Sequence, residues 1–221
     1  MAIEIDAILA LLAQVEGRRV AVGYVPSRRN SDGVGKNYVG RSMPTSSAMP
    51  AYPVCGNHTD FTAIDSSGVT IGTGIDLGAY DAKTLMGYGL PMGIVNVLRP
   101  YFGLKREDAL STLYRLPLII SPDTAALLDE CVIAGDCKSY IAPAYGRDSG
   151  VSFESLPAQA QAVIFSVCYQ YGVSGWRKFA PVTWGYLCKQ DWCKASAELI
   201  NGFKPYAGRR AIEGKLLREL C

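Results

Sequence analysis

The segment Thr70–Gly78 combines two hydroxyl groups, a carboxylate and three glycines within the sequence TIGTGIDLG. In an extended segment, alternate side chains share a face. One face then carries Thr70, Gly72, Gly74 and Asp76, and the other carries mainly apolar residues that can pack on a core. Glycine inside a strand often marks close approach by a ligand or by another backbone. Together with an upstream carboxylate at Glu16, this pattern predicts a surface suited to an extended sugar polymer.

Two carboxylates can cleave a glycosidic bond when one protonates the leaving oxygen and the other assists attack at the anomeric carbon. Glu16 is the candidate acid, because it ends an apolar helical pattern. Partial burial and the negative end of a helix both favour a protonated carboxyl, whereas Arg18 or Arg19 would oppose that effect. The alternative is a helix-end glutamate in a surface ion pair, and the downstream motif favours the catalytic interpretation.

Asp76 is the candidate for orienting the attacking water, with the hydroxyl of Thr70 sharing that water. Six fully extended residues span roughly 20 Å, which is too far for two side chains to hold one water. We therefore predict a bend at Gly72–Gly74, which glycine permits. Two alternatives stay open. Thr70 can be an ordinary β-branched strand residue, and Asp65 can be the active aspartate instead of a turn former.

A helix must carry Glu16 to the site. Apolar residues recur at helical spacing before it, at Ile5, Ile8, Leu9, Leu12 and Val15. Gly17 follows as a C-terminal cap. Residues 18–78 are rich in Gly, Ser, Pro, Asn and Thr, which predicts short strands and loops.

From Asp81 onward the pattern is helical. One helix opens near Pro91 and stops before Pro100, and another covers residues 106–114. Ser121 and Pro122 open a third, as N-cap and first-turn proline. The longest helix follows Leu156-Pro157 over residues 158–171 and ends at Gly172, and two or three more cover residues 181–220.

These elements predict a lysozyme-like α+β fold in a single domain spanning residues 1–221. Residues 1–80 would form the first helix and a small β lobe with an inserted loop at residues 27–67, and residues 81–221 a larger helical lobe. A length of 221 residues, with 49% hydrophobic and 19% charged residues, is sufficient for a sizeable core.

Composition excludes several functions. A net charge of +2 is too small to indicate nucleic-acid binding. No apolar run approaches the roughly 20 residues of a membrane span. The N-terminal residues lack the basic start of a signal peptide, so we expect the protein to be made in the cytoplasm without one.

The chain has seven cysteines, an odd number that leaves at least one without an intramolecular partner. Cys131 and Cys137, where a helix gives way to a loop at Gly135, could form one local disulfide, and Cys188 and Cys193 another. The alternative is that these are small buried apolar residues, as expected for Cys168. With one histidine, His58, and no Cys-x-x-Cys pair, we expect no metal site.

These residues resemble two related groups of enzymes. Glu16-Gly17 followed by a glycine-rich strand resembles the phage-type lysozymes, and the order of Thr70 and Asp76 is closer to that of the pesticin-like muramidases. Phage lysozymes carry their aspartate on the side of the threonine where Asp65 lies. The likeness continues at Leu156-Pro157, Gln161, Ser166, Tyr169-Gln170-Tyr171-Gly172 and Arg209-Arg210-Ala211-Ile212-Glu213. The family often has asparagine where this chain has Gln170.

The resemblance implies a muramidase that cleaves peptidoglycan glycan strands between N-acetylmuramic acid and N-acetylglucosamine, with inversion and without a cofactor. Its catalytic residues would be Glu16, Asp76 and Thr70. It would be a phage lysozyme or an antibacterial toxin, delivered for example by type VI secretion, acting in the periplasm or cell wall of a target bacterium. A cognate immunity protein is then expected. The alternatives are a catalytically silent wall-binding module and a lytic transglycosylase, which needs the glutamate but no positioned water.

The inserted segment has no assigned role. Six basic residues and one acidic residue, Asp32, lie between residues 18 and 48, the basic ones being Arg18, Arg19, Arg28, Arg29, Lys36 and Arg41. They could form a basic rim that holds stem-peptide carboxylates or a merely solvated loop. Tyr24, Tyr169 and Trp176 could stack on sugars, but aromatic residues are more often core, and we assign no substrate-binding residue.

Overall fold

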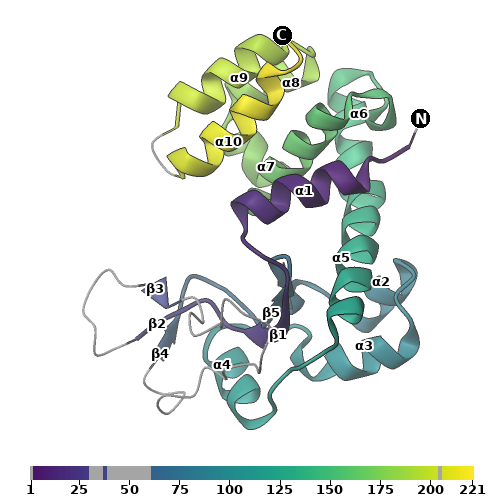
Figure 1. Cartoon of the computed structure of the whole chain (residues 1–221), viewed down its shortest axis with the longest axis vertical. Coiled ribbons are helices and arrows are strands. Elements are labelled where there is room, and N and C mark those ends of the chain that lie inside the picture. The colour runs from purple at the N-terminus through teal and green to yellow at the C-terminus, as the bar shows by residue number, and fades with distance from the viewer. Residues whose placement is uncertain (1, 30–36, 39–60, 204–205) are drawn as a thin grey trace. The chain divides into compact units, whose positions relative to one another are not determined.

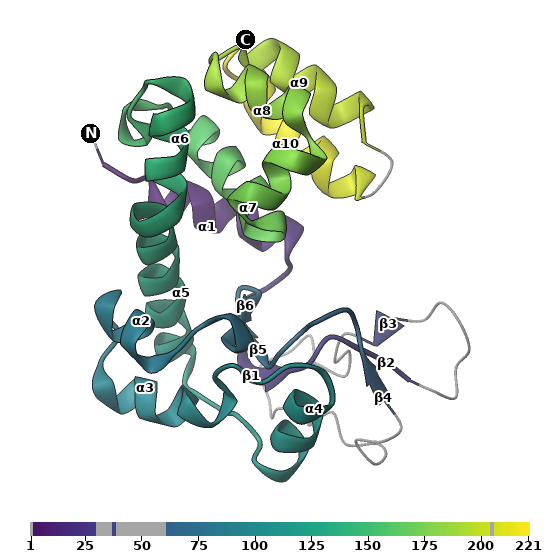
Figure 2. The ribbon, with the colours of Figure 1, turned by 180° about the vertical axis from the view of Figure 1, so that it is seen from behind.

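The computed structural model describes residues 2–29, 37–38, 61–203 and 206–221 (Figure 1). It divides into two compact units, which we describe separately. Unit 1 comprises Met1–Arg18 and Ile133–Cys221, and unit 2 comprises Arg19–Val132. Helices predominate and the strands are short and antiparallel, so the predicted lysozyme-like α+β fold is confirmed (Figures 1 and 2). The single-domain organisation with lobes divided at residue 80 stays a prediction.

The described residues of unit 2 form two small antiparallel sheets, with strand orders β1-β5-β6 and β3-β2-β4. The strands are β1 (Val20–Tyr24), β2 (Ser27–Arg29), β3 (Asn37–Tyr38), β4 (Phe61–Ala63), β5 (Thr70–Gly72) and β6 (Ile75–Asp76). The helical elements after them are η3 (Leu77–Ala79), α2 (Ala82–Gly87), α3 (Met92–Leu98), η4 (Arg99–Tyr101), α4 (Arg106–Arg115) and α5 (Pro122–Asp136), whose last turn belongs to unit 1.

The apolar face of the β5–β6 hairpin anchors the core of unit 2. Its four side chains are at most 2% exposed, and they are Val69, Ile71, Ile75 and Leu77. They pack with helical residues that include Leu85, Val95, Leu98 and Leu128. The predicted apolar face is therefore confirmed, whereas Thr70 and Gly72 of the opposite face are also buried. The register is fixed, because a slip by one residue would exchange the two faces.

The helix starts predicted in this unit are confirmed. α3 follows Pro91 as its N-cap, and α4 begins at Arg106. The side-chain oxygen of Ser121 accepts a hydrogen bond from the backbone N–H of Thr124 at 3.0 Å, which caps α5.

Unit 1 is helical. Its elements are α1 (Ile5–Val15), the π-helical turn η5 (Cys137–Ile141), α6 (Ala142–Ser149), the 3-10 turn η6 (Phe153–Ser155), α7 (Ala158–Phe179), α8 (Pro181–Cys188), α9 (Trp192–Asn201) and α10 (Ala207–Arg218). Three helices therefore follow residue 180, within the range predicted. α1 is the helix predicted before Glu16, and Gly17 follows it with φ of 96°.

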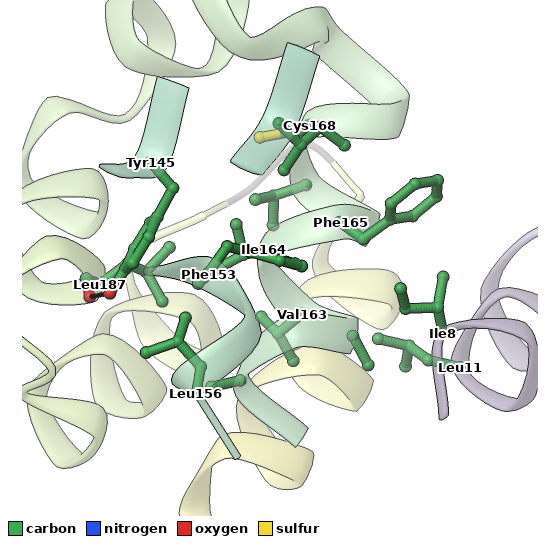
Figure 3. Packing of buried hydrophobic residues seen from close by; sticks show 14 of the residues in the cluster. Ile8, Leu11, Tyr145, Phe153, Leu156, Val163, Ile164, Phe165, Cys168 and Leu187 are labelled. Atoms are coloured by element: carbon green, nitrogen blue, oxygen red, sulfur yellow. Dashed lines mark hydrogen bonds between the residues drawn. The ribbon is translucent and has the colours of Figure 1, made fainter. Parts of the chain in front are cut away.

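The core of unit 1 is built around α7. Every residue from Ala160 to Cys168 is buried, as expected for a helix that is covered on all sides. Figure 3 shows its side chains between those of α1, such as Ile8, and those of α6 and α8, such as Tyr145 and Leu187. Helical geometry is lost at Gly172, as predicted (φ 67°, ψ 157°), and resumes to Phe179.

The disulfide between Cys131 and Cys137 that the sequence suggested is wrong. Gly135 does not end the helix, because α5 continues to Asp136 and passes directly into η5. Both cysteines are free. Six residues along a helix separate two positions by about 9 Å and turn them away from each other, which is beyond disulfide reach.

The suggested pair of Cys188 and Cys193 is also wrong. Cys193 at the start of α9 is bonded to Cys221, with 5.4 Å between their Cα atoms, and Cys188 is free. Cys168 is in the core, as expected, and burial raises the pKa of its thiol to about 12.

Candidate active site

The β5–β6 hairpin makes the bend that the sequence required. Thr70 is the cross-strand partner of Asp76, and Ile71 is the partner of Ile75. Gly72 and Gly74 have φ values of 64° and 83°, a region that favours glycine. Side chains directly opposite each other in an antiparallel pair have Cβ atoms about 5 Å apart. The hydroxyl of Thr70 and the carboxylate of Asp76 are therefore brought together, although they are six residues apart in sequence.

The carboxylate of Asp76 is held on both oxygens. Oδ1 accepts the backbone N–H of Gly78 at 2.8 Å, and Oδ2 forms an ion pair with Nζ of Lys105 at 2.7 Å. The side chain is 32% exposed. Each carboxylate oxygen has two acceptor positions, so Asp76 can still accept a hydrogen bond from a water molecule.

Two glycines make room for this carboxylate. A Cβ atom added to Gly68 would lie 2.4 Å from Oδ1 of Asp76, and one added to Gly78 would lie 3.0 Å from the same atom. Thr70 is buried, and its Oγ1 donates to the carbonyl oxygen of Gly68 at 3.3 Å. The backbone of Gly68 therefore contacts both members of the pair.

A buried carboxylate that the sequence analysis missed, Asp129 of α5, holds the tip of the hairpin. It is fully buried. Its Oδ1 accepts the backbone N–H of Thr73 at 2.8 Å, and its Oδ2 accepts the Thr73 hydroxyl at 2.7 Å and Nε of Arg19 at 2.6 Å. A Cβ on Gly72 would lie 2.3 Å from Oδ1. The only sequence signal was an aspartate beside Leu128, on the apolar side of a helix.

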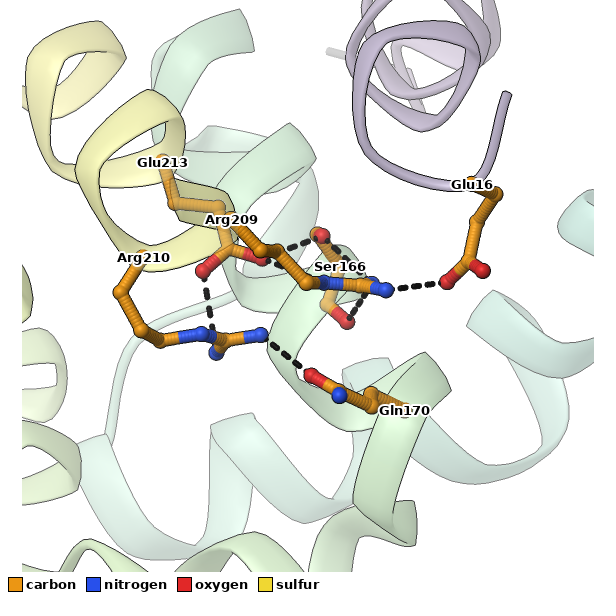
Figure 4. A network of polar contacts seen from close by, with 6 residues as sticks. All are labelled: Glu16, Ser166, Gln170, Arg209, Arg210 and Glu213. Carbon is orange, nitrogen blue, oxygen red and sulfur yellow. Dashed lines mark hydrogen bonds and ion pairs between the residues drawn. The ribbon is translucent and has the colours of Figure 1, made fainter. Parts of the chain in front are cut away.

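Glu16 lies in unit 1 as the C-cap of α1, and its backbone N–H donates to the carbonyl oxygen of Leu12 at 2.8 Å. Its side chain is 24% exposed, and Oε1 pairs with Nη1 of Arg209 on α10 (Figure 4). The cation paired with Glu16 is Arg209, whereas the sequence had suggested Arg18 or Arg19.

The side chain of Arg209 is 9% exposed, and hydrogen bonds to Glu213 and Ser166 fix the orientation of its guanidinium group. Its Nε donates to Oε1 of Glu213 at 3.1 Å. Its Nη2 donates to the carbonyl oxygen and to Oγ of Ser166, at 2.9 and 3.0 Å. These contacts leave Nη1 directed at Glu16, as Figure 4 shows.

Glu213 is fully buried behind Arg209. Oγ of Ser166 donates to its Oε1 at 2.6 Å, and Nη1 of Arg210 lies 2.9 Å from its Oε2. Burial raises the pKa of Glu213, whereas Arg210, Ser166 and Arg209 act in the opposite direction. Arg210 is held in turn by Oε1 of Gln170 and packs over the ring of Trp176, 5.1 Å from its centroid.

Three other residues that the sequence suggested as functional, Asp65, Tyr169 and Trp176, contribute to turns or packing in the structure. Asp65 lies in an exposed turn with φ of 54°, and its carbonyl oxygen accepts Nε of Arg106 at 3.1 Å. Trp176 is fully buried, and Tyr169 stacks on Phe165 with 5.4 Å between ring centroids. Both contribute to packing.

Several predictions concern residues outside the described part of the chain. These are Asp32, Lys36, Arg41, His58, most of the inserted loop 27–67, and the side chains of Arg28 and Arg29. Among the described residues, no three His, Cys, Asp or Glu side chains are grouped to hold a metal ion. No helix in the described ranges has the length and apolarity to span a bilayer.

Comparison with known families gives one match. The sequence profile of the family described as "Pesticin: Bacterial toxin homologue of phage lysozyme, C-term" matches residues 43–193. The matched stretch contains Thr70, Asp76 and Asp129, whereas Glu16 and Arg209 lie outside it. No curated protein matches the chain.

Proposed function

The chain belongs to the pesticin family of phage-lysozyme homologues, and from that premise we propose that it is a muramidase. Family membership supports a lysozyme-like glycoside hydrolase that acts on peptidoglycan. The bond cleaved is the one between N-acetylmuramic acid and N-acetylglucosamine. The observation that carries the proposal is the register that sets Thr70 opposite Asp76 across the glycine hairpin.

In the proposed reaction, Glu16 protonates the glycosidic oxygen and the leaving sugar departs. Asp76 accepts a proton from a water molecule that the hydroxyl of Thr70 helps to orient, and that water attacks the anomeric carbon. Direct attack by water inverts the configuration. Inversion requires the two carboxyl groups to stand roughly 6.5–9.5 Å apart when substrate is bound.

Digestion of purified peptidoglycan tests the function. Borohydride reduction followed by mass spectrometry should reveal new reducing ends at N-acetylmuramic acid. Anhydro sugar ends would identify a lytic transglycosylase instead, and undigested glycan would indicate a catalytically silent wall-binding module. Proton NMR of the first product should show the inverted anomer.

Substitution of the two carboxylates tests their roles. Glu16→Gln and Asp76→Asn should each lower kcat by about a hundredfold to ten-thousandfold, because each keeps the side-chain shape and removes one proton-transfer group. Asp65→Asn is the matched control and should keep full activity. Unchanged thermal unfolding of the three variants would show that the losses are catalytic, and full lytic activity of either active-site variant would refute its assignment.

The biological role is part of the same proposal. We propose a toxin that degrades the wall of a target bacterium, with a cognate immunity protein in the producing cell. The Cys193–Cys221 disulfide supports action in an oxidising compartment such as the periplasm. Copurification of the catalytically inactive Glu16→Gln protein with a small protein from the producing cell would identify the immunity partner.

A further inference from the structure

The side chain of Glu213 is fully buried. In space, one side chain separates it from Glu16, the candidate acid. Arg209 lies between them, with Nε on Glu213 and Nη1 on Glu16. A buried carboxylate is costly unless it is paired and fully hydrogen-bonded. Oε1 of Glu213 accepts hydrogen bonds from Ser166 and Arg209, and Oε2 forms an ion pair with Arg210.

An ionised Glu213 offsets one of the two positive charges in this cluster. Arginine is not deprotonated in proteins, so Arg209 and Arg210 are both positively charged. Without Glu213, two guanidinium groups would face the single carboxyl of Glu16. A nearby positive charge favours the ionised form of a carboxyl, and a nearby negative charge favours its protonated form.

We propose that Glu213 is a positioning residue for Glu16 that acts through Arg209. It fixes the direction of the Arg209 guanidinium and offsets its positive charge at the carboxyl group of Glu16. This inference rests on the proposed role of Glu16 as general acid.

Few other titratable groups surround the pair within unit 1. α1 contributes no charged residue between Asp6 and Glu16, and Arg18 follows as an exposed side chain. α7 contributes Cys168, Tyr169, Tyr171, Lys178 and Arg177, which pairs with Asp148. Burial raises the pKa values of Cys168 and Tyr171. α9 presents only the uncharged Ala195, Ser196 and Leu199 to the interior. Arg209, Arg210 and Glu213 therefore dominate the field at Glu16 among the groups of this unit.

Two substitutions have opposite predicted signs. Glu213→Gln removes a negative charge, so Glu16 loses its proton more readily and the alkaline limb of the kcat/KM profile moves to lower pH. Arg209→Gln removes a positive charge, so the same limb moves to higher pH. At an effective dielectric constant of about 20, a charge roughly 7 Å away shifts such a limb by about 1.7 pH units.

The experiment measures kcat/KM against pH for the full chain on purified peptidoglycan. It also follows the carboxyl carbon of Glu16 by ¹³C NMR over the same pH range, which needs no substrate. Glu219→Gln is the matched control, because it makes the same charge change at an exposed position near the end of α10. Opposite displacements in the two test variants, with none in the control, would support the proposal.

A purely structural role would give different results. Both variants would lose activity equally at every pH, and Glu16 would titrate as in the parent protein, which would overturn the proposal. If Glu213→Gln does not fold, Glu213→Asp retains the negative charge and should leave the alkaline limb of the kcat/KM profile in place. Arg209→Gln then shows in which direction a loss of charge moves that limb. If the parent protein does not cleave peptidoglycan, the proposed function fails, whereas the NMR titration still decides whether Glu213 controls Glu16.

Discussion

At the scale of single residues, the orientation of Asp76 depends on Lys105. The ammonium group contacts Oδ2 at 2.7 Å, and both side chains are about one third exposed. Charge-assisted hydrogen bonds to a carboxylate are short and directional. Gly78 fixes the other oxygen, so the two contacts together set the plane in which Asp76 can meet a water molecule.

Lys105→Met should therefore reduce kcat about tenfold, because a carboxylate held on one side samples unproductive orientations. The Michaelis constant should change little, since Lys105 need not touch the substrate. Steady-state kinetics on soluble glycan strands would measure both parameters. Lys189→Met makes the same charge change in unit 1 and serves as the control. An unchanged kcat for Lys105→Met would mean that Gly78 alone is sufficient.

At the scale of elements, the hairpin is positioned from its tip by α5. Asp129 accepts three hydrogen bonds. The two from Thr73 at the turn are buried, and the third comes from the partly exposed Arg19. The strands β5 and β6 are too short to be stable alone, because an isolated two-stranded hairpin is marginal in water. The hydrogen bonds to the buried carboxylate of Asp129 therefore stabilise the β5–β6 hairpin.

Asp129→Ala should destabilise unit 2 by about 3 kcal/mol, because it leaves the N–H of Thr73 and the guanidinium of Arg19 without their partner. For a chain of this length, that loss lowers the unfolding temperature by about 6–12 °C. Calorimetry would measure it, and amide hydrogen exchange should accelerate at Thr73. Asp191→Ala, at an exposed helix N-cap, should destabilise the protein much less than Asp129→Ala. Equal losses for the two variants would remove the special role of Asp129.

Local patterns explain why part of the site was predictable. The facing of Thr70 and Asp76 follows from strand alternation and from two glycines that must bend, and the position of Glu16 follows from a helix and its cap. Asp129 and Glu213 meet their partners 56 and 47 residues away in sequence. No spacing rule connects such residues, because only packing of α5 and α10 brings them there. The two predicted cysteine pairs were wrong because local spacing did not determine them. α5 continues through Gly135 instead of ending there. The disulfide partner of Cys193 is Cys221, 28 residues away in sequence.

At the scale of the whole molecule, each unit has its own hydrophobic core and its own buried carboxylate. Unit 1 has Glu213 behind Glu16, and unit 2 has Asp129 behind the hairpin. Glu213 is carried by α10, which packs along α9. The Cys193–Cys221 bond joins the start of α9 to the residue that ends the chain after α10. That covalent link therefore constrains the helix pair that supports Arg209 and Glu213.

Loss of this disulfide should destabilise unit 1. Closing a loop of 28 residues restricts the unfolded chain by about 3–4 kcal/mol in the chain-entropy model, which corresponds to roughly 6–16 °C in unfolding temperature. Reduction with dithiothreitol should accelerate hydrogen exchange in α9 and α10 and leave β5 and β6 unchanged. The double variant Cys193→Ser/Cys221→Ser should behave like the reduced protein and should not respond to dithiothreitol. If the double variant still loses stability on reduction, another cysteine pair is responsible. If neither treatment affects α9 and α10, the packing of these helices is sufficient without the bond.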